Sequence, residues 1–484
     1  MLVKEIFKNI EFDNNCGCED VEIGNLAFNT SDVKENSLYF CLEGTNVDGH
    51  SFAKEAIKRG ASCLVVQRFL PISFPQIKVD DCRKALALAS GNFFGNPAQK
   101  LHLIGITGTN GKTSSTYILK SILESCGKKV GVIGTLGVVI GNKHYPSDMT
   151  TPDPTKLHKI FFKMVQSKVE YVVMEVSAHA LDLKKLSGLT FDVGVLTNIT
   201  QDHLDYFKTF SRYALTKLDF ISPNYCKTGV VNLDDKLALT LFNKYKNSEF
   251  CCKGFGVDNK SDVFPNYYKL AGEGVCFNCG GFGYNQQYKT KLVGKFNLYN
   301  ILGCVAVAKA LGLDAEKVKV GIEQVLPIPG RFNVEKLCNG AFVVIDYAHT
   351  PDGLQKVLSS AREICEGRLF CVFGCGGNRD KTKRPVMGEI SGKLADYTII
   401  TSDNPRFENP ESIINDIKCG LLKVTSNFKC ITDRTKAIEY CVKLSKEKDV
   451  ILIAGKGAEN YLDVKGQKVH YSDFEVVESL KKGG

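Results

Sequence analysis

The chain has 484 residues, of which 44% are hydrophobic, and its 62 basic and 53 acidic residues give a formal net charge of +9. At about 100–200 residues per domain, the length suggests roughly two to four domains. The hydrophobic content excludes a disordered chain. No long basic block of the kind that marks a nucleic-acid tail is present, so we expect no nucleic-acid partner.

The first residues, MLVKEIFKNIEFDNN, contain no apolar signal-peptide core, and no stretch reaches about 18 consecutive apolar residues. We therefore expect a cytoplasmic protein with no transmembrane helix and no membrane partner. The 19 cysteines are expected to be reduced thiols, because a chain of this size needs no disulfide framework. Cys276 and Cys279 have C-x-x-C spacing without a second pair at zinc-ribbon spacing, so we interpret them as structural.

The N-terminal part contains short strand-like runs at 37–42 and 62–67 around a helix-like run at 52–60. Residues 91–100, GNFFGNPAQK, are rich in Gly, Asn and Pro and predict a linker. We place a first domain at residues 1–98.

From residue 101 onward, short runs rich in Val and Ile alternate with helical stretches, which is typical of buried parallel strands in an α/β fold. A boundary near LPIPGRF separates two such sets, which predicts a central domain at 99–328 and a C-terminal domain at 329–484. The predicted strands are 101–107, 128–134, 171–177, 191–198 and 228–235 in the first set, and 341–350, 369–377, 396–406 and 449–457 in the second.

The strand at 101–107 runs into a glycine-rich loop that begins a helix. Glycines let the backbone approach phosphates, amides at the helix N-terminus point at the anion, and a lysine can reach the outer phosphates. Ile106 stands where the longer P-loop pattern has glycine, so this is the shorter G-T-x-G-K-T form. The loop predicts ATP binding by Gly108, Thr109, Asn110, Gly111, Lys112, Thr113 and Ser114.

Two later strands end in residues that can bind a metal ion. Glu175 ends the strand at 171–177, and Asp202 and His203 follow the next strand. Because magnesium takes some of its ligands from nucleotide phosphates, it needs few protein ligands. Two such strand ends beside a phosphate loop indicate a Mg²⁺ site. Lys217 lies in a predicted helix, where a lysine is usually solvated.

The chain resembles the Mur ligase family from end to end, and its motifs occur in the family's order. The C-terminal ones are similar to the MurE branch, which adds the third amino acid to the UDP-muramyl peptide of bacterial cell walls. The matching motifs are GITGTNGKTSS, MEVSAHALD, TNITQDHLDYF, the YxxxK helix at Lys217, GKFNLYNILG, PGRFN, VIDYAHTPDGL, VFGCGGNRDKTKRP, TSDNPRFENP and IAGKGAENY.

The resemblance implies three domains: one for the UDP end of the substrate, a central P-loop domain with a parallel sheet for ATP and Mg²⁺, and a Rossmann-like C-terminal domain for the incoming amino acid. It also implies that a substrate carboxylate attacks the γ-phosphate of ATP and that an amine then displaces phosphate from the acyl phosphate. Phosphate is a far better leaving group than oxide, and lysine and metal charges would screen the approaching anions. A monomer is expected.

Site residues follow from the motif positions. The resemblance implies Thr113 and Glu175 at one Mg²⁺ ion, and His203 with a carbamylated Lys217 at a second. Lys112, Lys217 and His203 are the implied catalytic residues. The remaining ATP contacts are implied at Asn297, Asn300, Arg331 and Asp346. The contacts to the UDP-muramyl substrate are implied at Thr30, Thr45, Asn46, Thr150, Thr151, Ser177 and Lys185.

The sequence departs from the family at the UDP end. The usual Ser-Arg pair is replaced in the segment Thr30 to Val33, and Lys185 stands where an arginine is usual, so its charge is kept without the fork. Ala458 replaces a common histidine. These departures concern contacts to the UDP-muramyl end and leave the reaction class unchanged.

The amino-acid site is implied by three loop motifs, and its residues are Arg379, Asp403, Asn404, Pro405, Arg406, Gly455 and Glu459. The DNPR form resembles the version that selects meso-diaminopimelate, whose distal carboxylate an arginine fork can bind in two places. The expected substrates are UDP-MurNAc-L-Ala-D-Glu and meso-diaminopimelate.

Three alternatives stay open. A sister ligase would add L-lysine or another diamino acid. Folylpolyglutamate synthetases share the central fold but lack the UDP-binding domain and the DNPR motif. A nucleotide-binding regulator without catalysis would be expected to lose Lys112, Glu175, His203 or Lys217, and all four are present.

Overall fold

The structure is a computed structural model that describes residues 1–44, 47–259, 261–271, 274–280 and 286–482. None of the helices formed by these residues is both long and apolar enough to cross a membrane. The chain divides into two compact units, which are described separately. The first comprises residues 1–107, 127–195 and 219–229, and the second comprises 108–126, 196–218 and 230–484.

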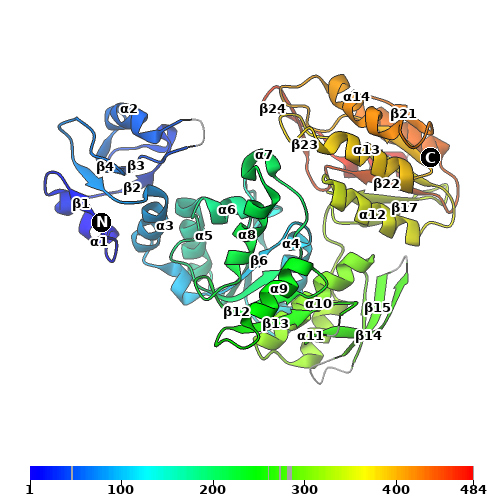
Figure 1. Ribbon diagram of the computed structural model, residues 1–484, viewed down its shortest axis with the longest axis horizontal. Helices are drawn as coiled ribbons and strands as arrows, with labels where there is room; N and C mark the ends of the chain where they lie inside the picture. The colour runs from blue at the N-terminus through cyan, green and yellow to red at the C-terminus, as the bar shows by residue number, and fades with distance from the viewer. Residues whose placement is uncertain (45–46, 260, 272–273, 281–285, 483–484) are drawn as a thin grey trace. The chain divides into compact units, whose positions relative to one another are not determined.

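The N-terminal part of the first unit is a five-stranded sheet in the order β1-β5-β4-β3-β2 (Figure 1). One face packs against α1 and α3, and the other packs against α2. The strands are β1 (Asp13–Asn14), β2 (Asn25–Ala27), β3 (Ser37–Phe40), β4 (Ala61–Val66) and β5 (Gln76–Lys78), and the helices are α1 (Val3–Ile6), α2 (Ala53–Lys58) and α3 (Cys82–Phe93).

An eight-stranded sheet follows in the order β13-β12-β11-β6-β10-β7-β8-β9. Strand β10 pairs in parallel with both β6 and β7, and β8 and β9 add an antiparallel edge. The strands are β6 (His102–Thr107), β7 (Val130–Gly134), β8 (Gly137–Ile140), β9 (Lys143–Tyr145), β10 (Tyr171–Glu175), β11 (Phe191–Leu196), β12 (Cys226–Asn232) and β13 (Cys251–Phe255). The five strands predicted for this sheet are confirmed.

Short and long helices connect these strands. Helix α10 is buried on nearly all sides, as expected for a helix that is apolar all round, and this burial fixes its few polar side chains. The helices are α4 (Lys112–Ser125), α5 (Pro154–Gln166), α6 (Ala178–Asp182), α7 (Leu204–Phe207), α8 (Phe210–Phe220), α9 (Lys236–Tyr245), α10 (Lys295–Ala310) and α11 (Ala315–Glu323).

A three-stranded antiparallel sheet precedes α10, with the order β14 (Phe264–Ala271), β15 (Gly274–Gly280) and β16 (Gln287–Thr290). It was not predicted beyond its C-x-x-C pair. Cys276 and Cys279 lie three residues apart on β15 and therefore point to opposite faces. All 19 cysteines lie in the described residues, and each is a free thiol.

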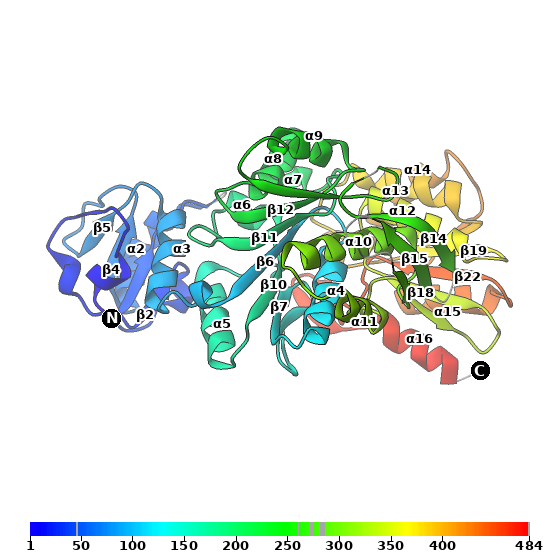
Figure 2. The same ribbon diagram turned by 90° about the horizontal axis from the view of Figure 1, so that it is seen from below.

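The C-terminal part of the second unit is a six-stranded sheet in the order β17-β18-β22-β19-β20-β21, with parallel pairing except at β17. Alternate strand residues face α12, α13 and α14 on one side and α15 and α16 on the other (Figure 2). The four predicted strands correspond to β18, β19, β20 and β22, and this two-sided covering confirms the α/β fold.

The elements of this part and its hairpin are β17 (Asn333–Lys336), β18 (Phe342–Asp346), α12 (Pro351–Glu363), β19 (Leu369–Phe373), α13 (Lys383–Leu394), β20 (Tyr397–Ile400), α14 (Pro410–Leu421), β21 (Phe428–Cys430), α15 (Arg434–Leu444), β22 (Val450–Ala454), β23 (Tyr461–Val464), β24 (Gln467–His470) and α16 (Asp473–Lys482).

Candidate active site

The glycine-rich loop of residues 108–111 ends at the first turn of α4. Gly108 and Gly111 have φ angles of +145° and +89°. A Cβ atom at Gly108 would overlap Thr197 Oγ1, and one at Gly111 would overlap Asn300 Oδ1. Only glycine fits at either position, both because of the positive φ and because of the space. The close approach also places Asn300, an expected ATP contact, against the loop.

Two neighbouring strand-end residues hold the loop. The Asn110 amide donates to Asn198 Oδ1 over 3.1 Å, and the Asn110 carbonyl accepts from Thr197 Oγ1 over 2.6 Å. Lys112 Nζ donates to the carbonyls of Gly108 and Thr109 over 2.7 and 2.9 Å. The lysine expected to reach phosphates therefore lies folded over its own loop.

Arg331 reaches the same loop. Its Nη2 donates to Thr113 Oγ1 over 2.9 Å, and its guanidinium lies 4.6 Å from the centre of the Tyr347 ring. Thr113 and Ser114 are buried in the first turn of α4. The structure thus brings Arg331 to the hydroxyl that was expected to bind magnesium.

Asp346 lies at the end of β18 and is buried. Its two oxygens accept from the amides of Phe332 and Ala348, each over 2.7 Å. Burial raises the pKa of Asp346 to about 6, although the nearby Arg331 and the two amides favour the charged form.

A cavity of about 270 Å³ lies in this part of the second unit. Asn297 and Arg331 line it together with Phe332 and Phe342. Asn297 Nδ2 donates to Val293 O over 2.8 Å, and its Oδ1 accepts from Asn300 Nδ2 over 3.2 Å. These contacts fix the two asparagines relative to one another on α10.

Lys217 is only 2% exposed on α8. Its Nζ donates to Gly108 O over 2.8 Å and lies 4.9 Å from the centre of the Tyr213 ring. The Tyr213 hydroxyl in turn contacts Thr109 Oγ1 over 3.0 Å. Burial, and next the nearby Lys112 ammonium, lower the pKa of Lys217 well below its usual value. Both effects disfavour the charged form of this amine.

Asp202 and His203 also lie in the second unit. His203 has a left-handed backbone with a φ of +54°, and its Nε2 lies 3.4 Å from Asp202 Oδ2. Burial, the largest single effect, would raise the pKa of Asp202, but His203, His349 and Lys383 together hold that pKa below its usual value.

Glu175, the other expected metal ligand, ends β10 in the first unit and is 1% exposed. Its Oε1 accepts from the Thr135 amide over 2.8 Å, and its Oε2 accepts from Thr135 Oγ1 over 3.2 Å. Sequence reasoning missed Thr135, whose only signal is its place directly after the strand that neighbours β10.

Three of the residues expected at the UDP-muramyl substrate, Thr150, Thr151 and Ser177, lie close to Glu175. Thr150 Oγ1 contacts Thr135 Oγ1 over 3.1 Å, and Thr151 Oγ1 donates to the Glu175 carbonyl over 2.9 Å. Ser177 Oγ accepts from the Ala180 amide and caps α6, and Lys185 pairs with Asp153 over 2.7 Å. Thr30 begins a 3₁₀ turn in the N-terminal part. Thr45 and Asn46 lie outside the described residues.

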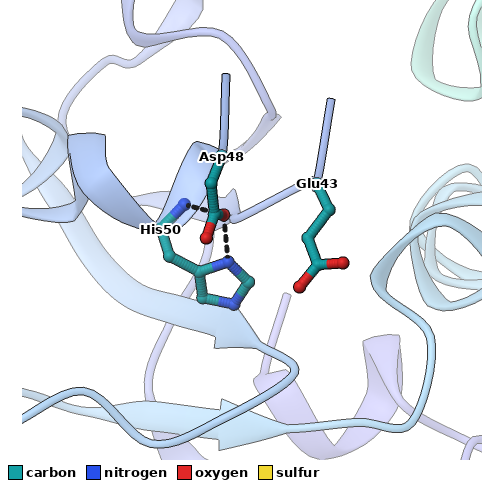
Figure 3. Close-up of side chains that lie close together, drawn as sticks. All are labelled: Glu43, Asp48 and His50. Carbon is teal, nitrogen blue, oxygen red and sulfur yellow. Dashed lines mark hydrogen bonds and ion pairs between the residues drawn. The ribbon is translucent and has the colours of Figure 1, made fainter. Parts of the chain in front are cut away.

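Glu43, Asp48 and His50 gather at the N-terminal sheet (Figure 3). His50 Nε2 accepts from the Gln67 amide over 3.0 Å, so the proton lies on Nδ1, which donates to Asp48 over 2.6 Å. The Arg68 guanidinium pairs with both carboxylates. The side chains of this cluster are hydrogen-bonded to one another, and the Arg68 guanidinium already offsets the charge of the two carboxylates. We therefore assign no metal ion to it.

The residues expected at the amino acid lie on three loops that follow β19, β20 and β22. These strands are neighbours in the parallel sheet, so their carboxyl ends meet at one edge. We call residues 374–381 the first amino-acid loop, 401–409 the second and 455–460 the third.

The first and second amino-acid loops are joined by hydrogen bonds. The Gly377 amide donates to the Asn404 carbonyl over 2.9 Å, and Arg406 Nη1 donates to the Gly377 carbonyl over 2.8 Å. The Phe407 amide donates to Asn378 Oδ1 over 3.0 Å, and the Asn378 amide donates to Glu408 Oε1 over 2.5 Å. These contacts hold Arg406 beside the loop that carries the exposed Arg379.

Arg406 itself has a left-handed backbone, with a φ of +52°. Its amide donates to the Asp463 carbonyl over 2.9 Å, its carbonyl accepts from the Lys465 amide, and its Nε lies 3.7 Å from Asp463 Oδ2. The unusual conformation is thus secured by pairing with the β23 hairpin. Neither this backbone nor its partners could be read from the DNPR letters.

Sequence reasoning also missed the support behind these loops. Arg384 is fully buried and binds both oxygens of Glu408 over 2.9 and 3.0 Å. These bonds hold the pKa of Glu408 at about 2. Lys456 is likewise fully buried and contacts Asn404 and Glu459. Gly455 has a φ of +116°, and a Cβ there would meet the buried carboxylate of Asp403.

Comparison with known families covers most of the chain. Residues 106–308 match the Mur ligase middle domain, residues 330–457 match the Mur ligase glutamate ligase domain, and residues 22–93 match the Mur ligase family catalytic domain. Two similar curated proteins are both UDP-N-acetylmuramoyl-L-alanyl-D-glutamate–2,6-diaminopimelate ligases. That of Clostridium acetobutylicum is 44% identical, covering 100% of this chain and 99% of its own, and that of Clostridium perfringens is 41% identical, covering 100% of both.

Solved structures agree. A UDP-N-acetylmuramoyl-L-alanyl-D-glutamate–2,6-diaminopimelate ligase superposes with a TM-score of 0.71 at 27% identity, covering 100% of this chain and 99% of that one. A folylpolyglutamate synthase from Mycobacterium tuberculosis reaches 0.63 at 18% identity and covers 77% of this chain and 92% of its own, a likeness of fold alone.

Proposed function

The chain belongs to the Mur ligase family, and we propose that it is the ATP-dependent ligase that adds meso-diaminopimelate to UDP-MurNAc-L-Ala-D-Glu in peptidoglycan precursor synthesis. Its full-length similarity to diaminopimelate ligases supports the reaction. The observation that carries the choice of amino acid is the pair of joined amino-acid loops, in which the Arg406 guanidinium donates to the loop that carries Arg379. We propose that the enzyme acts as a monomer in the cytoplasm and that its domains are 1–98, 99–328 and 329–484.

We propose that ATP binds at the loop of residues 108–111. The left-handed glycines, the start of α4 and Lys112 fit a phosphate chain. Asn297 and Asn300 would line the adenine side, and Arg331 and Asp346 would reach the phosphate and the ribose. Arg331 contacts the loop helix at Thr113, Asn300 lies against Gly111, and Asn297 lines the neighbouring cavity. Lys112 would leave its own loop carbonyls for the outer phosphates.

Magnesium suits the oxygen-rich groups of the site. Glu175 is a fully buried carboxylate whose oxygens are oriented by Thr135, and Thr113 offers a hydroxyl at the nucleotide loop. We propose Thr113, Glu175, His203 and a modified Lys217 as the residues that hold the metal. Bound Mg²⁺ supplies positive charge where a carboxylate and a phosphate approach each other.

We propose that Lys217 is carbamylated. A neutral amine attacks CO₂, a C–N bond forms, and one proton leaves, so that R–NH₂ becomes R–NH–COO⁻. Burial and the Lys112 ammonium both favour the neutral form of the amine, and the product carries the negative charge that this ammonium attracts. The carbamate also turns a cationic side chain into an oxygen ligand suited to a hard cation.

Chemistry at the site would proceed in two steps. The D-glutamate carboxylate attacks the γ-phosphate, ADP leaves, and an acyl phosphate forms. The amine of the amino acid then attacks the acyl carbon and displaces phosphate. Lys112 would stabilise the charge that develops on the transferred phosphoryl group. The UDP-muramyl substrate would be held by Thr150, Thr151, Ser177 and Lys185 together with Thr30, Thr45 and Asn46.

The proposed amino-acid specificity is tested with Arg406. The specificity constant kcat/KM is measured for meso-diaminopimelate and for L-lysine in the parent, Arg406→Ala and Arg406→Lys. We expect the parent to prefer diaminopimelate by up to about 10⁴-fold, because lysine has no distal carboxylate for the Arg406 guanidinium to bind. Arg406→Ala should narrow the gap by harming diaminopimelate, and Arg406→Lys should not restore it.

Arg362→Ala removes an arginine paired with Asp396 in the same domain and is the matched control, which should leave both constants unchanged. A parent that uses lysine as well as diaminopimelate would favour the alternative of a lysine-adding ligase. An Arg406→Ala variant that keeps normal use of diaminopimelate would contradict the assignment of this site.

A further inference from the structure

Lys456, in the third amino-acid loop, has no exposed surface. Its Nζ donates to Asn404 Oδ1 over 3.1 Å, lies 3.2 Å from Glu459 Oε2, and lies 5.5 Å from the centre of the Tyr461 ring. Burying an ammonium group is costly unless it is paired and hydrogen-bonded. Here Asn404 and Glu459 hydrogen-bond to the buried ammonium and offset this cost, and both residues are expected to bind the amino acid.

The amide of Asn404 is oriented by these contacts. Its Oδ1 accepts from Lys456 Nζ and also from the Asp463 amide over 2.9 Å, while its Nδ2 donates to Glu459 Oε2 over 2.9 Å. A flipped amide would turn its NH₂ group toward two donors. Lys456 therefore helps to fix which side of Asn404 offers a donor.

The same ammonium offsets the charge of Glu459. Glu459 Oε2 receives hydrogen bonds from both Lys456 and Asn404, and the Glu459 side chain is 22% exposed. An uncompensated carboxylate at this place would attract any ammonium group. Because Lys456 already pairs with the Glu459 carboxylate, a ligand end that carries only an ammonium group gains little electrostatic attraction there. A ligand end with both an ammonium and a carboxylate has no net charge and depends less on that attraction.

We propose that Lys456 is a positioning and specificity-determining residue of the amino-acid site. It fixes the Asn404 amide and offsets the charge of Glu459, so that the site favours a distal end with both an ammonium and a carboxylate over one with an ammonium alone. This inference rests on the proposed function, because it assigns Asn404 and Glu459 to the amino acid.

The test is a double-mutant cycle of Lys456→Met, Glu459→Gln and the double variant, with kcat/KM measured for meso-diaminopimelate and L-lysine. Lys456→Met leaves Glu459 uncompensated and should narrow the preference for diaminopimelate by about tenfold or more. Glu459→Gln leaves the ammonium uncompensated and should widen the preference. The double variant, which is neutral at both positions, should return toward the parent.

The kinetic constants distinguish a positioning role of Lys456 from a merely structural one. If Lys456 positions the amino-acid site, Lys456→Met should change the KM for the amino acid and leave the KM for ATP within about twofold of the parent value. Lys468→Met removes an exposed lysine that lies over the same Tyr461 ring, and this control should match the parent. If Lys456→Met does not fold, the test rests on two other measurements. Glu459→Gln should widen the preference for diaminopimelate, and the double variant should bring this preference back toward the parent value.

Two results would overturn the inference. The first is a preference for diaminopimelate over lysine that is unchanged in both single variants. The second is a Lys456→Met effect on this preference that has the same sign and size whether position 459 is Glu or Gln. A parent enzyme without preference for diaminopimelate would instead refute the proposed function, so the two failures are distinguishable.

Discussion

Acidification should open the packing between α3 and α5, because His158 is buried where its charged form is not solvated. His158 is 4% exposed, and its Nδ1 has no hydrogen-bond partner among the residues that the structure describes. Gly91 on α3 lies so close that an added Cβ would be 3.3 Å from His158 Cε1. Burial lowers the pKa of His158 to about 4 from its usual value of 6.5.

The magnitude follows from that shift. Because the folded-state pKa is depressed, the unfolded chain binds the proton first, and stability is lost as the pH falls from about 6.5 toward 4. A shift of about 2.5 pKa units corresponds to about 3 kcal/mol of unfolding free energy when the loss is complete. Most of this loss, about 2.5 kcal/mol, is expected between pH 7.5 and pH 4.5.

The assay is hydrogen exchange of peptides from α3 and α5 at pH 7.5 and pH 4.5, corrected for the intrinsic rates. The parent should lose protection there at low pH, whereas His158→Leu, which cannot be protonated, should lose much less. His470→Leu removes a histidine whose side chain is 66% exposed and serves as the matched control. A pKa near 6.5 for His158 by NMR, or equal acid sensitivity in the parent and His158→Leu, would refute the reasoning.

Three further predictions concern the proposed ATP and metal site. Lys112→Ala should lower kcat by about 10²–10³-fold or more with unchanged circular dichroism, and near-normal phosphate release would exclude its assigned role. Lys217→Ala should be inactive and partly rescued by acetate or formate; mass spectrometry and ¹³CO₂ NMR should detect the carbamate in the parent, and an unmodified active enzyme would contradict it. Protonation of Asp346 below about pH 6 should raise the KM for ATP, and Asp346→Asn should abolish this pH dependence.

Strand positions could be predicted because their causes are local. The runs that became β6, β10 and β22 are apolar, β-branched and bounded by glycine or polar residues, and their burial requires no knowledge of distant partners. The conformation of the glycine-rich loop at residues 108–111 could be predicted for the same reason, because its glycines meet a conformational need that is visible in the sequence.

Burial of charged residues could not be predicted in the same way. Nothing in the local sequence distinguishes Lys217 and Lys456 from exposed lysines. Both are buried, and each bonds to a residue far along the chain, Gly108 for Lys217 and Asn404 for Lys456. Thr135 gave no signal because its role depends on the side chain of Glu175, 40 residues later. The left-handed backbone of Arg406 depends on pairing with the β23 hairpin, which no motif encodes.

The hydrogen bonds between the first and second amino-acid loops have a consequence for protein engineering. Each loop supplies backbone and side-chain partners that the other needs, from Gly377 and Asn378 on one side to Arg406 and Glu408 on the other. A loop transplanted alone from a relative with another substrate would arrive without its counterpart. Chimeras joined between residues 382 and 400 should therefore lose these hydrogen bonds between the two loops. Exchange of the whole segment 369–410 keeps both loops together with their partners.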